Sequence, residues 1–131
     1  MKIIADTNVL ARAILQDDPI QCQAARKALK DASLIAVSVT SLCELVWILR
    51  QGAKLSKDDI AIAIRRLLDT SNVVMNRTAA EVGLALLETG GDFADAVIAH
   101  EGRWLGGETF VSFDRKAVSL LNKQGKETQL L

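Results

Sequence analysis

The sequence contains few aromatic residues and has no excess of positive charge. Phe, Trp and Tyr make up 4% of the 131 residues, and tyrosine is absent. The 16 Lys and Arg residues are balanced by 16 Asp and Glu residues. This composition excludes modules that bind single-stranded nucleic acid by stacking bases on exposed aromatic side chains. A phosphate substrate would have to be attracted locally, by metal ions or a few arginines, because there is no global basic field.

Residues that commonly bind zinc or act as catalytic bases are also scarce. The single histidine, His100, lies beside Glu101 near a predicted helix end and has no partners for a catalytic triad. Cys22 and Cys43 lie in apolar stretches without a His or second Cys at metal-ligand spacing, which is typical of buried thiols in a reducing compartment. The N-terminal apolar run is too short for a signal peptide or a membrane span. We therefore expect a cytoplasmic protein with no membrane partner.

Apolar residues are plentiful, at 50% of the chain with a mean hydropathy of +0.20, which is enough for one packed core. Short β-type runs alternate with helical patterns. Strands are predicted over 2–5, 34–39, 72–75 and 109–113, with a further short strand near Thr128. Helices are predicted over 7–16, 19–30, 40–50, 56–69, 78–89, 92–101 and 115–122. This alternation implies parallel pairing through right-handed crossovers. The predicted fold is α/β, a three-layer α/β/α sandwich with a short, mostly parallel sheet, forming a single domain over residues 1–131.

Four acidic residues stand at the starts of predicted helices, namely Asp6, Glu44, Asp95 and Asp114. Asp6 and Asp114 directly follow short apolar β-type runs. In a parallel α/β sheet, helices begin at the carboxyl ends of the strands, so we expect the four side chains to converge on one edge. Oxygen ligands without paired His or Cys favour Mg²⁺ or Mn²⁺ over zinc.

Each of these acids also has a purely structural explanation. Asp6 and Asp114 are in position to N-cap a helix. Glu44 is placed to complete a capping box with Ser41, and Asp95 to do the same with Asp92. Negative charge in a first helical turn also complements the helix dipole. A cluster of four carboxylates would instead lower the stability of the metal-free protein, because like charges repel.

Four sequence motifs contain these acids, in an order that resembles the signature of PIN-domain nucleases. They are Asp6-Thr7-Asn8, Ser41-Leu42-Cys43-Glu44-Leu45, the segment from Asp92 to Ala99, and Thr109-Phe110-Val111-Ser112-Phe113-Asp114-Arg115. The chain length and compactness further resemble the VapC-type toxins of bacterial toxin–antitoxin pairs. The resemblance covers essentially the whole chain.

The resemblance implies an endoribonuclease that depends on Mg²⁺ or Mn²⁺, is often a homodimer, and is inhibited by a small antitoxin protein encoded beside it. Cleavage of RNA would leave 5′-phosphate and 3′-hydroxyl ends. By position, the catalytic and metal-site acids are Asp6, Glu44, Asp95 and Asp114. The polar positions that support them are Asp92, Thr7, Ser41 and Ser112.

Several other residues are candidates for contacts with a substrate or partner. The candidate phosphate contacts are Arg12, Arg50, Arg103 and Arg115. Arg115 is the best placed, because it is adjacent to Asp114. Trp47 and Ile48 fall off the main apolar stripe of the predicted helix over 40–50, which fits either an ordinary core or an interface. The glycine-rich stretch from Gly102 to Thr109 carries Trp104 and matches no family motif.

Two other functions remain open. A haloacid-dehalogenase-like phosphatase would need a second aspartate two residues after Asp6, and Asn8 occupies that place. A catalytically idle interaction module of the same fold would bind an antitoxin-like partner without cleaving RNA. The intact set of four acids argues against such a module.

Overall fold

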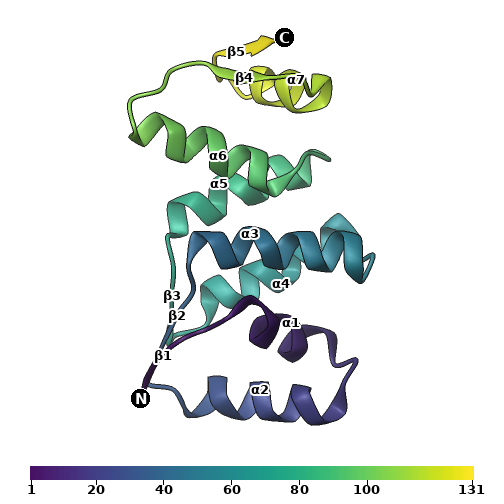
Figure 1. Cartoon of the computed structure of the whole chain (residues 1–131), viewed down its shortest axis with the longest axis vertical. Helices are drawn as coiled ribbons and strands as arrows, with labels where there is room; N and C mark the ends of the chain where they lie inside the picture. The colour runs from purple at the N-terminus through teal and green to yellow at the C-terminus, as the bar shows by residue number, and fades with distance from the viewer. The chain divides into compact units, whose positions relative to one another are not determined.

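Five short strands, all paired in parallel, alternate with seven α-helices in the computed structural model, which describes residues 1–131 (Figure 1). The elements form two compact units, Met1–Arg77 and Thr78–Leu131, each with its own sheet. The predicted α/β class with short parallel pairing is confirmed. The strands are shorter than the sequence patterns suggested, at two or three residues each.

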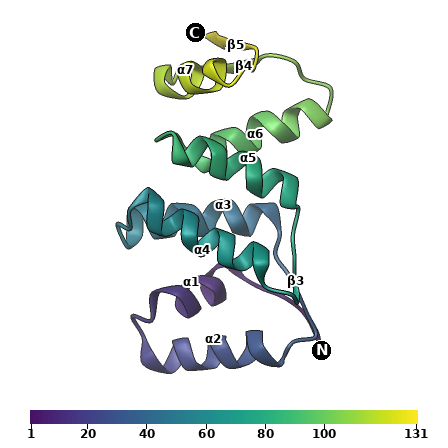
Figure 2. The ribbon, with the colours of Figure 1, turned by 180° about the vertical axis from the view of Figure 1, so that it is seen from behind.

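The N-terminal unit contains a three-stranded sheet in the order β1-β2-β3. Its strands are β1 (Lys2–Ile4), β2 (Leu34–Ala36) and β3 (Val73–Val74). Its helices are α1 (Thr7–Leu15), α2 (Pro19–Asp31), α3 (Val39–Trp47), the π-helix η1 (Ile48–Gly52) and α4 (Lys57–Asp69). Helix α1 lies between α2 and α3 (Figure 2). The largest fully buried side chains of this unit are Leu10, Leu42, Leu45, Leu49, Ile60 and Ile64.

The start of α3 differs from the sequence prediction, which had a strand continuing to Val39 and a helix beginning at Thr40. The hydroxyl oxygen of Ser38 accepts a hydrogen bond from the backbone N–H of Ser41 at 3.1 Å, so Ser38 is the N-cap. A capped helix that starts at Val39 leaves no room for the end of the predicted strand. The predicted helix end near Arg50 falls within a π-helix, because the α-helix ends at Trp47 and the chain continues as η1 to Gly52.

The C-terminal unit contains a two-stranded parallel sheet and three helices. They are α5 (Arg77–Glu88), α6 (Phe93–Trp104), β4 (Phe110–Ser112), α7 (Arg115–Lys123) and β5 (Thr128–Leu130). Leu86, Ala96 and Leu121 form a buried cluster that joins the three helices. The ring of Phe93 packs directly on the backbone of α5, since a Cβ atom at Gly83 would lie 2.4 Å from its Cε2.

Helix α6 runs one turn beyond its predicted end near Glu101. Its C-terminus is closed by two glycines, with Gly106 at φ +103 and the N–H of Gly107 donating to the carbonyl of Gly102 at 2.9 Å. This left-handed cap satisfies carbonyls of the last turn. Trp104 therefore belongs to the helix rather than to a loop, and its side chain is 81% exposed.

Candidate functional site

Asp6 lies two residues after the end of β1 and occupies the N-cap position of α1, with an extended backbone (φ −71, ψ 151). Its side chain makes no capping hydrogen bond, and the residue is exposed. Only its carbonyl oxygen accepts helical bonds, from the N–H groups of Val9 and Leu10. The side-chain capping explanation therefore fails for Asp6, and the whole carboxylate is available to a ligand.

Thr7 links Asp6 to Glu44. The Thr7 side chain is only 4% exposed, and its hydroxyl donates to Oε2 of Glu44 at 3.5 Å. This long hydrogen bond joins the first turn of α1 to α3 and brings Glu44 close to the end of β1. The capping-box explanation for Glu44 is wrong, because Ser38 is the N-cap and Glu44 lies well inside α3. Glu44 is exposed at that position.

Ser41 lies one helical turn before Glu44 on α3. Its hydroxyl oxygen accepts a hydrogen bond from the Ser38 hydroxyl at 3.2 Å. In the N-terminal unit the structure therefore brings together Asp6, Thr7 and Glu44, with Ser41 on the same helix as Glu44.

In the C-terminal unit, two of the predicted acids do serve as helix caps. Oδ1 of Asp92 accepts from the N–H of Ala94 at 2.8 Å at the start of α6. Oδ1 of Asp114 accepts from the N–H groups of Lys116 and Ala117, at 2.9 and 3.1 Å, at the start of α7. In both residues the second carboxylate oxygen makes no such bond. The capping explanation is thus correct for Asp114, but it uses only one of the two oxygens.

Ser112 fixes the backbone at the same place. Its hydroxyl oxygen accepts from the N–H of Asp114 at 3.0 Å, which holds the turn between β4 and α7. Ser112 therefore helps to fix the position of Asp114.

Asp95 lies in the first turn of α6 and is partly buried. Burial, and then repulsion from Asp92 and Asp114, raises the pKa of Asp95 to about 6. The three acids of the C-terminal unit thus share a region in which negative charge is unfavourable. A bound cation would relieve this repulsion.

The predicted site residues are divided between the two units. The N-terminal unit supplies Asp6 and Glu44, and the C-terminal unit supplies Asp95 and Asp114. Neither unit by itself brings three Asp, Glu, His or Cys side chains close enough to hold a metal ion. The donor atoms are all carboxylate oxygens, which suit a hard divalent cation such as Mg²⁺ or Mn²⁺.

A family model described as PIN domain matches residues 3–120, a span that includes all eight predicted site residues. The chain belongs to the PIN-domain family. PIN domains are generally metal-dependent nucleases that use divalent ions and act on nucleic acids. The short parallel sheets and seven helices are consistent with a PIN-like α/β/α fold. A comparison with curated proteins finds no match to this chain. None of the helices of this PIN-domain protein is long and apolar enough to cross a membrane.

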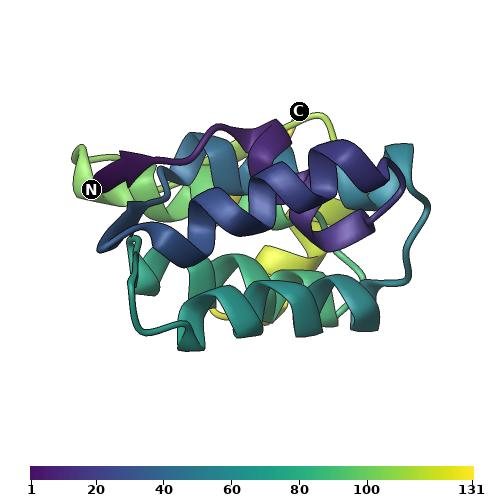
Figure 3. The same ribbon diagram turned by 90° about the horizontal axis from the view of Figure 1, so that it is seen from below.

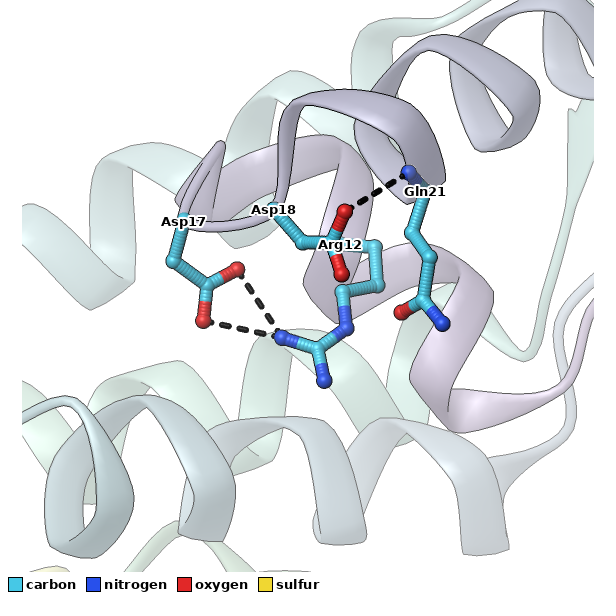
Figure 4. A network of polar contacts seen from close by, with 4 residues as sticks. All are labelled: Arg12, Asp17, Asp18 and Gln21. Atoms are coloured by element: carbon cyan, nitrogen blue, oxygen red, sulfur yellow. Dashed lines mark hydrogen bonds and ion pairs between the residues drawn. The ribbon is translucent and has the colours of Figure 1, made fainter.

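The arginines predicted to contact phosphate differ in their surroundings. Nη1 of Arg12 binds both carboxylate oxygens of Asp17, at 2.8 and 3.0 Å (Figure 4). This ion pair lowers the pKa of Asp17. Arg115 is exposed at the first position of α7, beside Asp114. In η1, the Nη1 atom of Arg50 is buried without a hydrogen-bond partner.

Sequence patterns did not reveal the ion pair between Arg12 and Asp17. Their spacing of five residues spans the turn between α1 and α2, so neither helical periodicity nor a motif connects them. The sequence also left two explanations for Trp47, and the core explanation is wrong, since this residue is 64% exposed. Ile48 is partly buried.

Proposed function

We propose that this PIN-domain protein is an endoribonuclease that depends on Mg²⁺ or Mn²⁺, and that residues 1–131 act as one nuclease domain. In this proposal Asp6, Glu44, Asp95 and Asp114 contribute to a single metal site. The family match supports one domain, because it runs through both units. The observation that carries the proposal is the Asp6 carboxylate, which stands in an N-cap position but is not used as a cap.

A divalent cation held by these acids would lower the pKa of a water molecule bound to it and would neutralise charge at the scissile phosphate. Asp6, Glu44 and Asp95 are the residues that would hold the metal through their carboxylate oxygens. Asp114 has one oxygen committed to its helix cap, so only its other oxygen would be free to help hold the metal. Thr7, through its bond to Glu44, restrains that side chain in the arrangement.

The supporting polar residues hold the acids in place. Asp92 begins α6 and thereby sets the position of Asp95 on its first turn. Ser112 holds the turn that carries Asp114. Ser41 is the fourth supporting residue proposed, one turn from Glu44.

We further propose a VapC-type toxin that forms a homodimer in the cytoplasm and is inhibited by a cognate antitoxin protein. The resemblance in length and motif order supports this assignment. The exposed Trp47 on α3 is the candidate anchor for the dimer or the antitoxin, because exposed tryptophans are enriched at protein interfaces. The catalytically idle module and the haloacid-dehalogenase-like phosphatase are not favoured by the family match, and the latter lacks its second aspartate at Asn8.

The proposal is tested by incubating the purified protein with single-stranded RNA and with DNA of the same sequence, in Mg²⁺, in Mn²⁺ and in EDTA. We expect cleavage of RNA only, in either metal, leaving 5′-phosphate and 3′-hydroxyl ends. Co-expression with a small protein from the adjacent reading frame should abolish the cleavage. Cleavage that persists in EDTA, or ends that carry a cyclic phosphate, would overturn the metal mechanism.

A further inference from the structure

We propose that the groove between α1 and α2 binds one unstacked base of the RNA strand, next to the site of cleavage. The inference rests on the proposed nuclease function and adds a determinant of sequence preference to it. The groove lies wholly within the N-terminal unit, where the two helices pack side by side (Figure 3).

The groove has the size and the apolar lining that a flat ring requires. Its volume is about 350 Å³, and its apolar lining residues are Val9 of α1 and Ala24, Ala25 and Ala28 of α2. Alanines allow a planar group to approach the helix closely, because they add a single methyl each. RNA-binding proteins that read sequence do so mostly on single-stranded segments whose bases are splayed out into such sites.

The rim carries polar groups that match the edge of a base. Asn8 and Arg12 on α1, four residues apart and so on one face, lie opposite Gln21 on α2. The side-chain amides of Asn8 and Gln21 make no hydrogen bond within the protein. Each amide offers a donor and an acceptor, as the edge of a base does.

The ion pair with Asp17 holds the guanidinium of Arg12 in place and leaves some of its N–H donors free. Asp17 binds Nη1, while Nη2 and Nε have no hydrogen-bond partner (Figure 4). A guanidinium held in this way presents a plane on which a base can stack. Because Asp17 offsets the charge of Arg12, the groove suits a neutral base better than a phosphate.

An apolar protein side chain is a poorer occupant of the groove. It would cover the alanines but make no hydrogen bond with the amides of Asn8 and Gln21, which are exposed. A base would satisfy both amides and still cover the alanines.

The groove also lies in the right place for a neighbouring nucleotide. Asn8 is in the first turn of α1, two residues after Asp6. Arg12 is six residues after Asp6, about 9 Å further along the helix axis. A strand with its phosphate at Asp6 can therefore place an adjacent base over the alanines.

The test is cleavage of an RNA pool of random sequence, read by sequencing the new ends. The variants are Gln21→Ala, which removes one amide, and Ala28→Leu, which places a larger side chain in the groove. Gln23→Ala is the matched control, because Gln23 is an exposed glutamine of the same helix that does not line the groove. We expect the parent and Gln23→Ala to prefer one base at a fixed position beside the cut. In Gln21→Ala and Ala28→Leu the ratio of preferred to disfavoured base should fall by roughly fivefold or more.

A second measurement separates this inference from the nuclease proposal. Binding of four short homopolymer RNAs is measured by fluorescence anisotropy in EDTA, where no cleavage is needed, and thermal melts check that each variant is folded. The parent should bind one homopolymer best, and both groove variants should lose that preference. If the parent cleaves RNA but folded groove variants keep its base preference, the groove inference is wrong and the nuclease proposal stands. If the groove variants instead lose only the binding of a co-expressed antitoxin, the occupant is a protein and the inference is also wrong.

Discussion

At the scale of single residues, Asp6 and Asp114 hold equivalent positions with different hydrogen bonding. Each occupies the N-cap position of a helix, but only the side chain of Asp114 accepts hydrogen bonds from the backbone of its helix. Asp114 therefore stabilises its helix as a cap, whereas the carboxylate of Asp6 does not.

The first prediction compares alanine and amide substitutions at these two positions, measured by urea unfolding in EDTA. Asp114→Ala should lower the free energy of unfolding by about 1 kcal/mol, because two capping bonds are lost. Asp6→Ala should cost much less, since its carboxylate makes no capping bond. Asp6→Asn should keep its stability in EDTA and lower the rate of RNA cleavage by on the order of 100-fold. A loss of about 1 kcal/mol in Asp6→Ala, with cleavage retained in Asp6→Asn, would show that Asp6 is only a cap.

The second prediction concerns the pH dependence of stability in EDTA. The folded protein raises the pKa of Asp95 to about 6, above the ordinary value of 3.8, so it binds more protons than the unfolded chain between these values. The free energy of unfolding should therefore fall as the pH rises from about 4 to about 6. The effect should be on the order of 1 kcal/mol, since Asp95 is partly exposed to water.

Asp95→Asn should lose this component of the pH dependence and be more stable than the parent at pH 7. The measurement is urea unfolding of both proteins at several pH values, and Asp58→Asn on the exposed first turn of α4 is a control. The parent's free energy of unfolding is compared with that of Asp95→Asn at each pH. If this difference rises over this pH range, the repulsion among Asp92, Asp95 and Asp114 is contradicted.

At the scale of elements, glycines in two helices have opposite surroundings. Gly83 of α5 lies against the ring of Phe93, while a Cβ at Gly102 of α6 would meet nothing within 4 Å. Helix propensity alone favours alanine at both positions.

The third prediction uses this pair. Gly102→Ala should stabilise the protein by about 0.5–1 kcal/mol, from propensity and reduced freedom of the unfolded chain. Gly83→Ala should destabilise it by about 1–3 kcal/mol, because the Phe93 ring must move. Urea unfolding of the two variants measures both values. Stabilisation by both substitutions would show that α6 does not pack on α5 as described.

Much of this element structure was predictable from the sequence. The alternation of short β-type runs and helical patterns, with Asp18 and Pro19 at the start of α2, predicted the order of elements correctly. The errors have local causes, namely the Ser38 cap and the two glycines that close α6. The π-helix η1 has no simple sequence pattern that distinguishes it from an α-helix.

The candidate site was predictable in part. That Asp6 and Asp114 follow strands could be predicted from apolar runs that end in an acid. The partial burial of Asp95, the free carboxylate of Asp6 and the groove beside α1 depend on contacts between distant residues. No local pattern contains that information.

At the scale of the whole molecule, the proposed function requires both units. The PIN-domain match runs from residue 3 to residue 120, and each unit supplies two of the four acids. If a single metal site serves the protein, loss of one acid from either unit should weaken the binding of the same ion.

The most direct measurement of this claim is a thermal melt of the parent, Asp6→Asn and Asp95→Asn across a Mn²⁺ series, beside an RNA-cleavage assay. The parent should gain about 2.7 kcal/mol of stability at roughly 100-fold excess of metal over Kd. Each variant, one from each unit, should lose most of that gain together with cleavage. If both variants respond to Mn²⁺ as the parent does and still cleave RNA, the four acids do not form one metal site and the proposed function is wrong.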